Sequence, residues 1–217
     1  MSVFKHNNNL YIKNLELILS NNNSLNPFVE HKCVKPGLCG IDTLVLINWL
    51  KLIGANKVVE FGCGTTSIRM KNAGINVKSF SIGYPVHGPQ SGIEFIKCDL
   101  LTMDKDTILS SINSADAIVI DCLHEFDFAK YYHENFLTKT DRPVWIHDVY
   151  NYETWGEYKY GEAEYLYKHV FNKTHEIFTM TDIPLEKQKL KEIFNIDIDK
   201  HIGRDKIGVC SVIINPY

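Results

Sequence analysis

The chain has 217 residues, 45% of them hydrophobic, which is enough for one domain with a substantial buried core. It carries 23 Lys and Arg against 26 Asp and Glu, so no excess of positive charge marks it as a nucleic-acid binder. No apolar run approaches the roughly 18 residues of a membrane span, and the N-terminus lacks a signal-peptide pattern, so we expect no membrane partner.

The six cysteines are scattered along the chain without a Cys-x-x-Cys pair. This spacing indicates neither a zinc site nor a disulfide framework. Most of them lie in or beside apolar runs, where cysteine behaves as a small hydrophobic residue. A reducing, cytoplasmic location is therefore expected.

The N-terminal part, residues 1–40, is expected to form a cap segment ahead of a core at 41–217. It contains a short amphipathic helix at residues 10–20, followed by irregular chain with several Pro and Gly residues. Residues 41–53 have the length and apolar pattern of a buried helix, with Gly54 at its C-terminal side. No internal repeat or linker is visible, so a single domain is predicted.

The segment Lys57–Ser67 reads Lys-Val-Val-Glu-Phe-Gly-Cys-Gly-Thr-Thr-Ser. An apolar run ends in the carboxylate of Glu60. Gly62 and Gly64 then come before a segment that can begin a helix. This order predicts a strand, a tight loop and a helix N-terminus. Glycines suit the loop because a backbone that turns sharply and lets a ligand lie against it has no room for Cβ atoms. The N–H groups of the helix would then bind polar ligand atoms.

Apolar runs and helical patterns alternate along the rest of the chain. The predicted strands are 77–82, 93–97, 115–120, 143–146, 176–180 and 207–214. The predicted helices are 67–73, 103–113, 125–137 and 157–171, with a polar helical stretch at 184–195. Strands that are apolar on both faces and separated by helices predict a parallel sheet covered on both sides. The fold class is therefore α/β, three-layer and doubly wound.

The glycine loop resembles motif I of class I S-adenosylmethionine-dependent methyltransferases, in which an acidic residue closes the first strand and Gly-x-Gly follows. A dinucleotide-binding loop would have a third glycine where Ser67 stands. The Gly-x-Gly-x-Thr-Ser ending is most similar to the branch with small-molecule and sugar O-methyltransferases. The resemblance covers about residues 41–180. It implies a Rossmann-like, mostly parallel seven-stranded sheet with an antiparallel last strand.

The resemblance also implies an S-adenosylmethionine site at the carboxyl ends of the strands. Asp99 matches the residue that accepts a hydrogen bond from the adenine amino group, and Leu100 would flank the ring. Asp121, after the fourth strand, would lie near the methionyl end. The implied cofactor contacts are Glu60, Gly62, Cys63, Gly64, Thr65, Thr66, Asp99, Leu100 and Asp121. The alternative role for Asp99 is a cap of the helix at 103–113 or of the turn that connects to it.

The sequence Ile-His-Asp-Val-Tyr at 146–150 resembles the fifth-strand motif of family members that pair a histidine with an aspartate. The implied fold brings His147 and Asp148 beside Asp121, and these three are the predicted catalytic residues. His147 is expected to be the general base, because imidazole titrates near neutral pH. Asp148 would orient it or the acceptor. The alternative for His147 is a strand-end side chain bonded to a backbone carbonyl.

A divalent metal is an open alternative. Some methyltransferases of this fold bind Mg²⁺ through carboxylates at the ends of strands four and five. Asp121 and Asp148 match two of the ligand positions, but Val149 stands where the third should be.

Four side chains near these strand ends are predicted to bind the methyl acceptor: His124, Tyr150, Tyr152 and Trp155. Aromatic faces beside hydroxyl and amide groups suit a sugar or glycan. The alternative is that the aromatic residues pack the following helix, 157–171, onto the sheet.

The sequence thus predicts an enzyme that methylates a hydroxyl of a small acceptor related to sugars or glycans. One departure from the family is that the second strand ends in Ile82-Gly83-Tyr84, without the carboxylate that usually holds the ribose. That departure favours the alternative of a non-catalytic binding protein with the same fold. A second alternative, an NAD(P)-dependent oxidoreductase, is disfavoured by the missing third glycine.

Overall fold

The computed structural model describes residues 46–47, 49–83, 92–147, 161–170, 177–180 and 209–214. The expected cap at 1–40, with its helix at 10–20, and the polar helical stretch at 184–195 lie outside these ranges. The helix expected at 41–53 is observed at residues 46, 47 and 49–52. None of the helices in the described ranges is long and apolar enough to cross a membrane.

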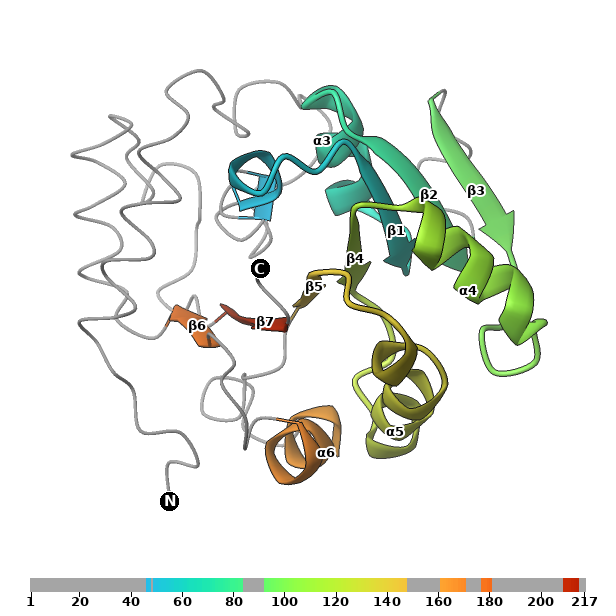
Figure 1. The fold of residues 1–217 in the computed structure, drawn as a ribbon, viewed down its shortest axis with the longest axis vertical. Coiled ribbons are helices and arrows are strands. Elements are labelled where there is room, and N and C mark those ends of the chain that lie inside the picture. Colours follow the sequence, from blue (N-terminus) through green and yellow to red (C-terminus); the bar gives the residue numbers. More distant parts are fainter. Residues whose placement is uncertain are drawn as a thin grey trace.

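Seven strands form one sheet in the order β3-β2-β1-β4-β5-β7-β6 (Figure 1). Their bounds are β1 Lys57–Phe61, β2 Asn76–Ser81, β3 Ile93–Lys97, β4 Ala117–Ile120, β5 Val144–Ile146, β6 Ile177–Met180 and β7 Val209–Ile214. Strands β1 to β5 pair in parallel, and β7 runs antiparallel to both neighbours. The predicted doubly wound sheet with an antiparallel last strand is confirmed.

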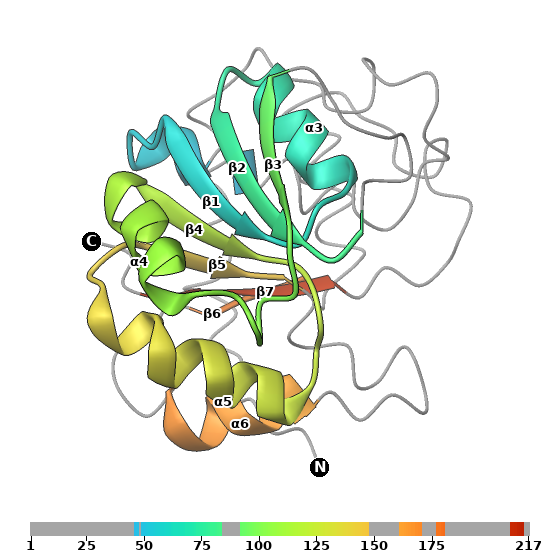
Figure 2. The ribbon, with the colours of Figure 1, turned by 90° about the vertical axis from the view of Figure 1, so that its right-hand side faces the viewer.

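Helices cover both faces of this sheet. Their bounds are α3 Thr65–Asn72, α4 Lys105–Ser114, α5 Phe126–Asn135 and α6 Gly161–His169, with a 3-10 turn at Leu137–Lys139. Helices α5 and α6 lie side by side on one side of the sheet, and α3 lies on the other (Figure 2). The main core forms where α4, α5 and α6 pack on β1 and β4; it includes Phe61, Ile108, Ile118, Phe128 and Leu166.

The second face of the sheet is closed by α3 and the helical residues near Trp49. Trp49 packs against Trp145 of β5 with ring centroids 5.5 Å apart. From α3, Ser67 reaches the side chain of Glu60 on β1. Because successive side chains of a strand point to opposite faces, Phe61 faces the main core while Glu60 faces α3. The result is the expected three layers.

Strand β4 begins later than the predicted start at residue 115. Ala115 closes α4, since its N–H donates to the Ile112 carbonyl. Asp116 is held by the start of β1, because its carboxylate accepts the N–H groups of Asn56 and Lys57, each at 2.9 Å. The apolar run in the sequence alone did not reveal these hydrogen bonds of the Asp116 side chain.

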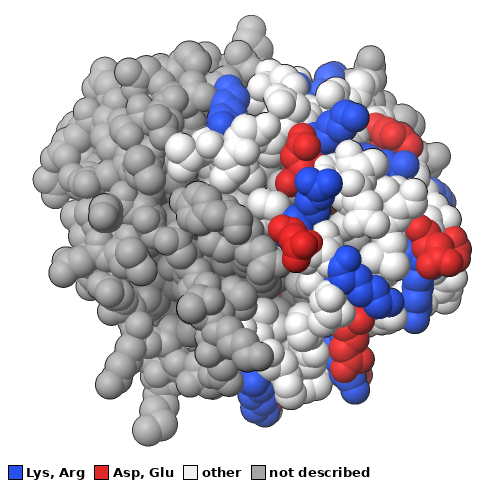
Figure 3. Space-filling view, in the orientation of Figure 1, with Lys and Arg blue, Asp and Glu red and all other residues white. Residues whose placement is uncertain are grey.

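Charged side chains of both signs are interspersed on the described part of the face shown in Figure 3. Lys78 and Glu94, on neighbouring strands, form one such pair at 2.9 Å. Both side chains are partly or well exposed, so the pair contributes little to stability. No patch of one sign stands out on that part of the face.

Backbone hydrogen bonds extend beyond the last residues of the strands and keep the carboxyl ends of neighbouring strands side by side. The N–H of Asp121 donates to the last residue of β1 at 2.9 Å, and the N–H of His147 donates to the last residue of β4 at 2.8 Å. The N–H of Gly62 donates to Phe80 of β2 at 2.9 Å. The strand order reverses between β1 and β4, so these residues meet where α/β sheets bind their ligands.

Gly62 is required at this point for two reasons. Its φ of 114° lies in a region that L-residues rarely adopt. A Cβ there would also overlap the backbone carbonyl oxygen of Asp121. The close approach of the two strand ends therefore depends on the missing side chain.

We expect Gly62→Ala to destabilise the protein by at least about 2 kcal/mol more than Gly74→Ala, because overpacking against rigid backbone adds to the dihedral strain. Gly74 is a matched control, since it also has a positive φ, 86°, but nothing lies within 4 Å of its Cβ position. Urea unfolding of both variants measures the difference. Equal losses would mean that the contact with Asp121 is unimportant.

Candidate active site

The side chain of Glu60 anchors the loop that contains Gly62 and Gly64 through hydrogen bonds. Its side chain is buried, 1% exposed, and its Oε2 accepts hydrogen bonds from Ser67 of α3 and Ser79 of β2, each at 2.5 Å. Ser67 Oγ also accepts the Gly64 N–H at 3.0 Å. One carboxyl group therefore ties β1, β2 and the start of α3 together. Its direct contact with a cofactor stays a prediction.

Gly64 presents an open backbone to solvent. Its φ of −164° is an extended conformation that other residues adopt, and nothing lies within 4 Å of its Cβ position. The two loop glycines thus differ in role. Gly62 is needed by the fold, whereas Gly64 leaves a surface against which a ligand can lie.

A cavity of about 300 Å³ opens at the carboxyl ends of β1 to β4. It is lined by Gly62, Cys63, Phe80, Ser81, Ile82, Cys98, Asp99, Leu100, Leu101, Asp121, Cys122, Leu123 and Phe128. Five residues predicted to contact the cofactor are among them: Gly62, Cys63, Asp99, Leu100 and Asp121. The structure therefore brings together, in one hollow, residues that are far apart in sequence.

The cavity rim is apolar. Ile82, Leu101 and Leu123 are 61%, 50% and 45% exposed, and all three line the hollow. Exposed large apolar side chains grouped around a concave surface indicate a binding site. Their arrangement suits a flat ring better than a charged group.

Asp99 stands at the same rim. Its Oδ1 accepts the Leu101 N–H at 3.0 Å, which shapes the turn after β3. It does not cap α4, because Asp104 does so through its hydrogen bond with the Thr107 N–H at 2.9 Å. Of the two alternatives for Asp99, the cap of the helix is therefore wrong, whereas the hydrogen bond in the connecting turn is observed.

A larger hollow, of about 490 Å³, lies at the opposite edge of the sheet. It is formed by the amino ends of β1 to β3 and by α4, with Lys57, Asn76 and Ser114 in its wall. Ligands of open α/β sheets bind at the carboxyl ends, and the predicted site residues lie there. We therefore take the smaller cavity as the candidate site.

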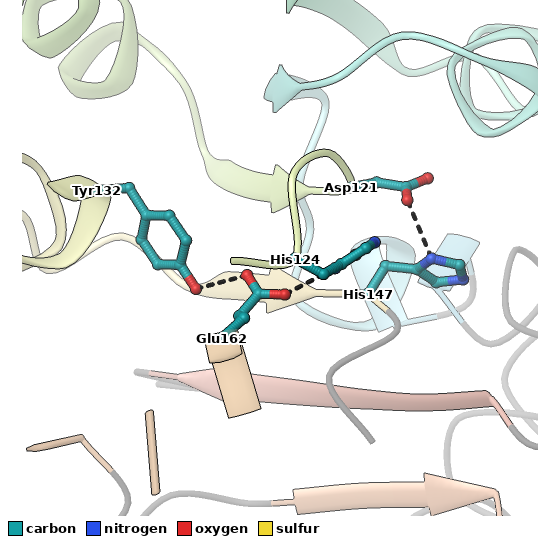
Figure 4. A network of polar contacts seen from close by, with 5 residues as sticks. All are labelled: Asp121, His124, Tyr132, His147 and Glu162. Atoms are coloured by element: carbon teal, nitrogen blue, oxygen red, sulfur yellow. Dashed lines mark hydrogen bonds and ion pairs between the residues drawn. The ribbon is translucent and has the colours of Figure 1, made fainter. Parts of the chain in front are cut away.

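Asp121 and His147 form a hydrogen-bonded pair beside this cavity (Figure 4). His147 Nδ1 lies 3.1 Å from Asp121 Oδ1, and the two side chains are 7% and 28% exposed. Burial acts to raise the pKa of Asp121, but the charge and hydrogen bond of His147 and the charge of His124 outweigh it and lower that pKa. Asp121 is thus a carboxylate that only accepts, so Nδ1 of His147 is the donor.

A second network lies next to the first. His124 Nδ1 is 2.7 Å from Glu162 Oε2, and the Tyr132 hydroxyl donates to Glu162 Oε1 at 2.8 Å (Figure 4). Both Glu162 and Tyr132 are buried, 0% exposed. Burial raises the pKa of Glu162, and the hydrogen bonds and charge of His124 and the hydrogen bond of Tyr132 oppose that rise.

Cysteine chemistry is not favoured at the cavity. Burial raises the pKa of the Cys63 thiol, and burial with nearby carboxylates raises that of Cys122 well above its usual value. Both side chains remain thiols at neutral pH, and a thiol is a poor nucleophile.

Several predicted residues cannot be placed in the cavity. Asp148, Tyr150, Tyr152 and Trp155 lie outside the described residues. Thr65 begins α3, and Thr66 is buried, 6% exposed, in its first turn. The described residues include no group of three His, Cys, Asp or Glu side chains arranged to hold a metal. A Mg²⁺ site that uses Asp121 and Asp148 stays a prediction.

Sequence reasoning missed two parts of the site. Glu162 and Tyr132 were taken only as helix residues, because nothing in their local pattern tells that Glu162 reaches His124 and that Tyr132 reaches Glu162. The apolar rim was missed as a set, although Ile82, Leu101 and Leu123 each follow a strand end by one to four positions. That position was the available signal.

No family model and no curated protein matches the chain. Similar solved structures include an S-adenosylhomocysteine-bound methyltransferase from Podospora anserina, PaMTH1, with 9% identity, 98% of each chain covered and a TM-score of 0.49. An O-methyltransferase from Bacillus cereus with S-adenosylhomocysteine has 12% identity, a TM-score of 0.46, and 99% of this chain and 94% of that chain covered.

A third similar structure is the O-methyltransferase TomG from Streptomyces achromogenes with S-adenosylmethionine, with 10% identity, a TM-score of 0.45, and 99% and 92% covered. Identities this low assign no function. The strand order and the reversed last strand identify the architecture independently. The chain has a Rossmann-like α/β fold with an antiparallel last strand, the architecture that its resemblance to class I methyltransferases implies.

Burial, more than the opposing hydrogen bonds of Ser67 and Ser79, sets the pKa of Glu60 and raises it from 4.5 to about 8. The folded protein then binds a proton that the unfolded chain releases between these two pH values. This bound proton stabilises the folded protein fully below about pH 4.5. The stabilisation, roughly 5 kcal/mol at most, is lost as the pH rises to about 8.

We therefore expect Glu60→Gln to remove this pH dependence and to gain stability relative to the wild type as the pH rises from about 5 to about 8. Urea unfolding of both proteins across that range measures it. A difference between the two proteins that does not change with pH would show that Glu60 is ionised throughout.

Proposed function

We propose that this protein is an S-adenosylmethionine-dependent O-methyltransferase that acts on a hydroxyl group of a small molecule. The observation that supports this most is the open backbone at Gly64 beside an apolar-rimmed cavity that ends at the Asp121–His147 pair. A long ligand with a flat ring at one end and a reactive group at the other suits that arrangement.

The chain offers suitable groups along the length of the cofactor. The rim residues Ile82 and Leu101 would pack on the adenine ring, and the Asp99 carboxylate would accept from its amino group. The N-terminus of α3 and the Gly64 backbone would face the polar tail. When bound, S-adenosylmethionine supplies a methyl group on a cationic sulfur, which the acceptor oxygen takes while S-adenosylhomocysteine leaves as a neutral thioether.

His147 removes the proton of the acceptor hydroxyl in this proposal. With Nδ1 donating to the Asp121 carboxylate, Nε2 carries the lone pair that accepts a proton. The carboxylate fixes the orientation of the ring and stabilises the imidazolium that forms, as an aspartate does in other acid–base pairs. Asp121 thus takes over, among the described residues, the orienting role expected of Asp148.

A sugar or glycan is the acceptor class we propose. It is supported by the aromatic, hydroxyl-rich sequence that contains Tyr150, Tyr152 and Trp155 and follows β5 directly. Such side chains stack on the C–H faces of a sugar ring and bond to its hydroxyls.

We expect S-adenosylhomocysteine to raise the melting temperature, because a ligand that binds only the native state stabilises it by mass action. Gly64→Val should fold normally, since its backbone and surroundings permit a side chain, but should lose the shift. Thermal scans with S-adenosylhomocysteine, and with NAD as a control ligand, measure this. A shift that persists in Gly64→Val, or one produced by NAD alone, would contradict the proposal.

We expect His147→Ala to lower kcat for methyl transfer by roughly 10² to 10⁴ with little change in S-adenosylhomocysteine affinity, the usual contribution of a general base. Turnover is measured by transfer of labelled methyl groups to a panel of hydroxylated sugars. Near wild-type kcat in the variant would remove His147 as the base. Loss of wild-type activity in EDTA and its recovery with Mg²⁺ would support a metal held by Asp121 and Asp148.

A further inference from the structure

The pair of His124 and Glu162 is built from elements that the proposed reaction does not yet use. His124 lies in the loop after β4, Glu162 in the first turn of α6, and Tyr132 on α5. Three separate parts of the chain thus converge on the Glu162 carboxylate. The exposed fraction falls from 22% at His124 to 0% at the Glu162 side chain.

Burial of the Glu162 side chain lowers the stability of the fold unless other contacts compensate. A fully buried carboxylate is strongly destabilising unless its oxygens are hydrogen-bonded. Here Tyr132 occupies Oε1 and His124 occupies Oε2. The preceding residue, Gly161, lets α6 come close to α5, because a Cβ there would lie 2.5 Å from the backbone nitrogen of Phe126.

The contacts of Glu162 also assign the proton of the neutral His124 ring to one of its two nitrogens. A buried tyrosine hydroxyl donates to one oxygen, and the separation of 2.7 Å at the other is typical of an N–H donating to a carboxylate. Nδ1 then carries the proton, and Nε2 is the accepting atom. The ring extends from Glu162 toward Asp121 and His147 (Figure 4).

We propose that Glu162, supported by Tyr132, is a positioning residue that holds His124 so that Nε2 accepts a hydrogen bond from a second hydroxyl group of the methyl acceptor. This rests on the proposed function and narrows it to acceptors with two neighbouring hydroxyl groups, one at His147 and one at His124. Among the described residues, the titratable groups that act on His124 directly are Glu162 and Asp121, and Tyr132, His147 and Cys122 lie beside these two carboxylates.

Long-range ¹H–¹⁵N NMR spectra of the histidine rings test the geometry without any acceptor. At about pH 7.5 the wild type should show His124 protonated at Nδ1 alone, with its signals assigned by their loss in His124→Gln. Glu162→Gln should lose this single form, and Tyr132→Phe should keep it. Glu164→Gln is the matched control on the same helix, because that exposed carboxylate pairs with Lys168 instead.

Kinetics with an active sugar from the panel test the role. His124→Gln and Glu162→Gln should each raise KM for the acceptor by about tenfold, the value of one hydrogen bond, with kcat changed by less than about threefold. The double variant should be no worse than His124→Gln alone.

A ring protonated at Nε2 in the wild type, or additive losses in the double variant, would overturn the role of Glu162. Absence of S-adenosylhomocysteine binding would instead count against the proposed function, and the ring spectra would still report the His124 tautomer.

Discussion

A single buried carboxyl group organises the candidate cofactor site. Glu60 accepts two short hydrogen bonds, one from Ser67 of α3 and one from Ser79 of β2. Ser67 in turn accepts a hydrogen bond from the Gly64 N–H. The loop between the first strand and its helix is therefore fixed from within the protein rather than by a ligand. Burial raises the pKa of Glu60 to about 8, so the group is largely neutral at pH 7 and no full charge is buried beneath the glycine loop. Its role is to anchor the loop.

Two histidine–carboxylate pairs lie at the carboxyl edge of the sheet and provide its hydrogen-bond-accepting groups. His147 and His124 each direct Nδ1 at a carboxylate. In its neutral form, each ring therefore offers Nε2 as its accepting atom. Two oriented acceptors near one another can hold a molecule with two hydroxyl groups and remove a proton from only one of them. Positioning, more than a strongly activated nucleophile, would then supply most of the rate.

The fold was largely readable from the sequence, and the site only in part. Alternating apolar runs and the Lys57–Ser67 motif predicted the parallel sheet and its glycine loop, because strand ends and turns leave local signals. The convergence of Asp99 and Asp121 on one cavity was predicted from the rule that ligands lie at strand ends. The role of Glu162 was not, since it depends on the packing of α6 against α5. Side-chain contacts between distant segments leave no periodicity to read.

Hydrogen–deuterium exchange with and without S-adenosylhomocysteine tests the central claim that the glycine loop and the smaller cavity form the cofactor site. The account predicts slower exchange at residues 62–67 and 98–101 when the ligand is added, because Gly62, Cys63 and residues 98–101 line the cavity and residues 64–67 continue the same loop into α3. Exchange at the amino ends of β1 to β3, around the larger hollow, should not change. Protection at that opposite edge, or none at the glycine loop, would contradict the account.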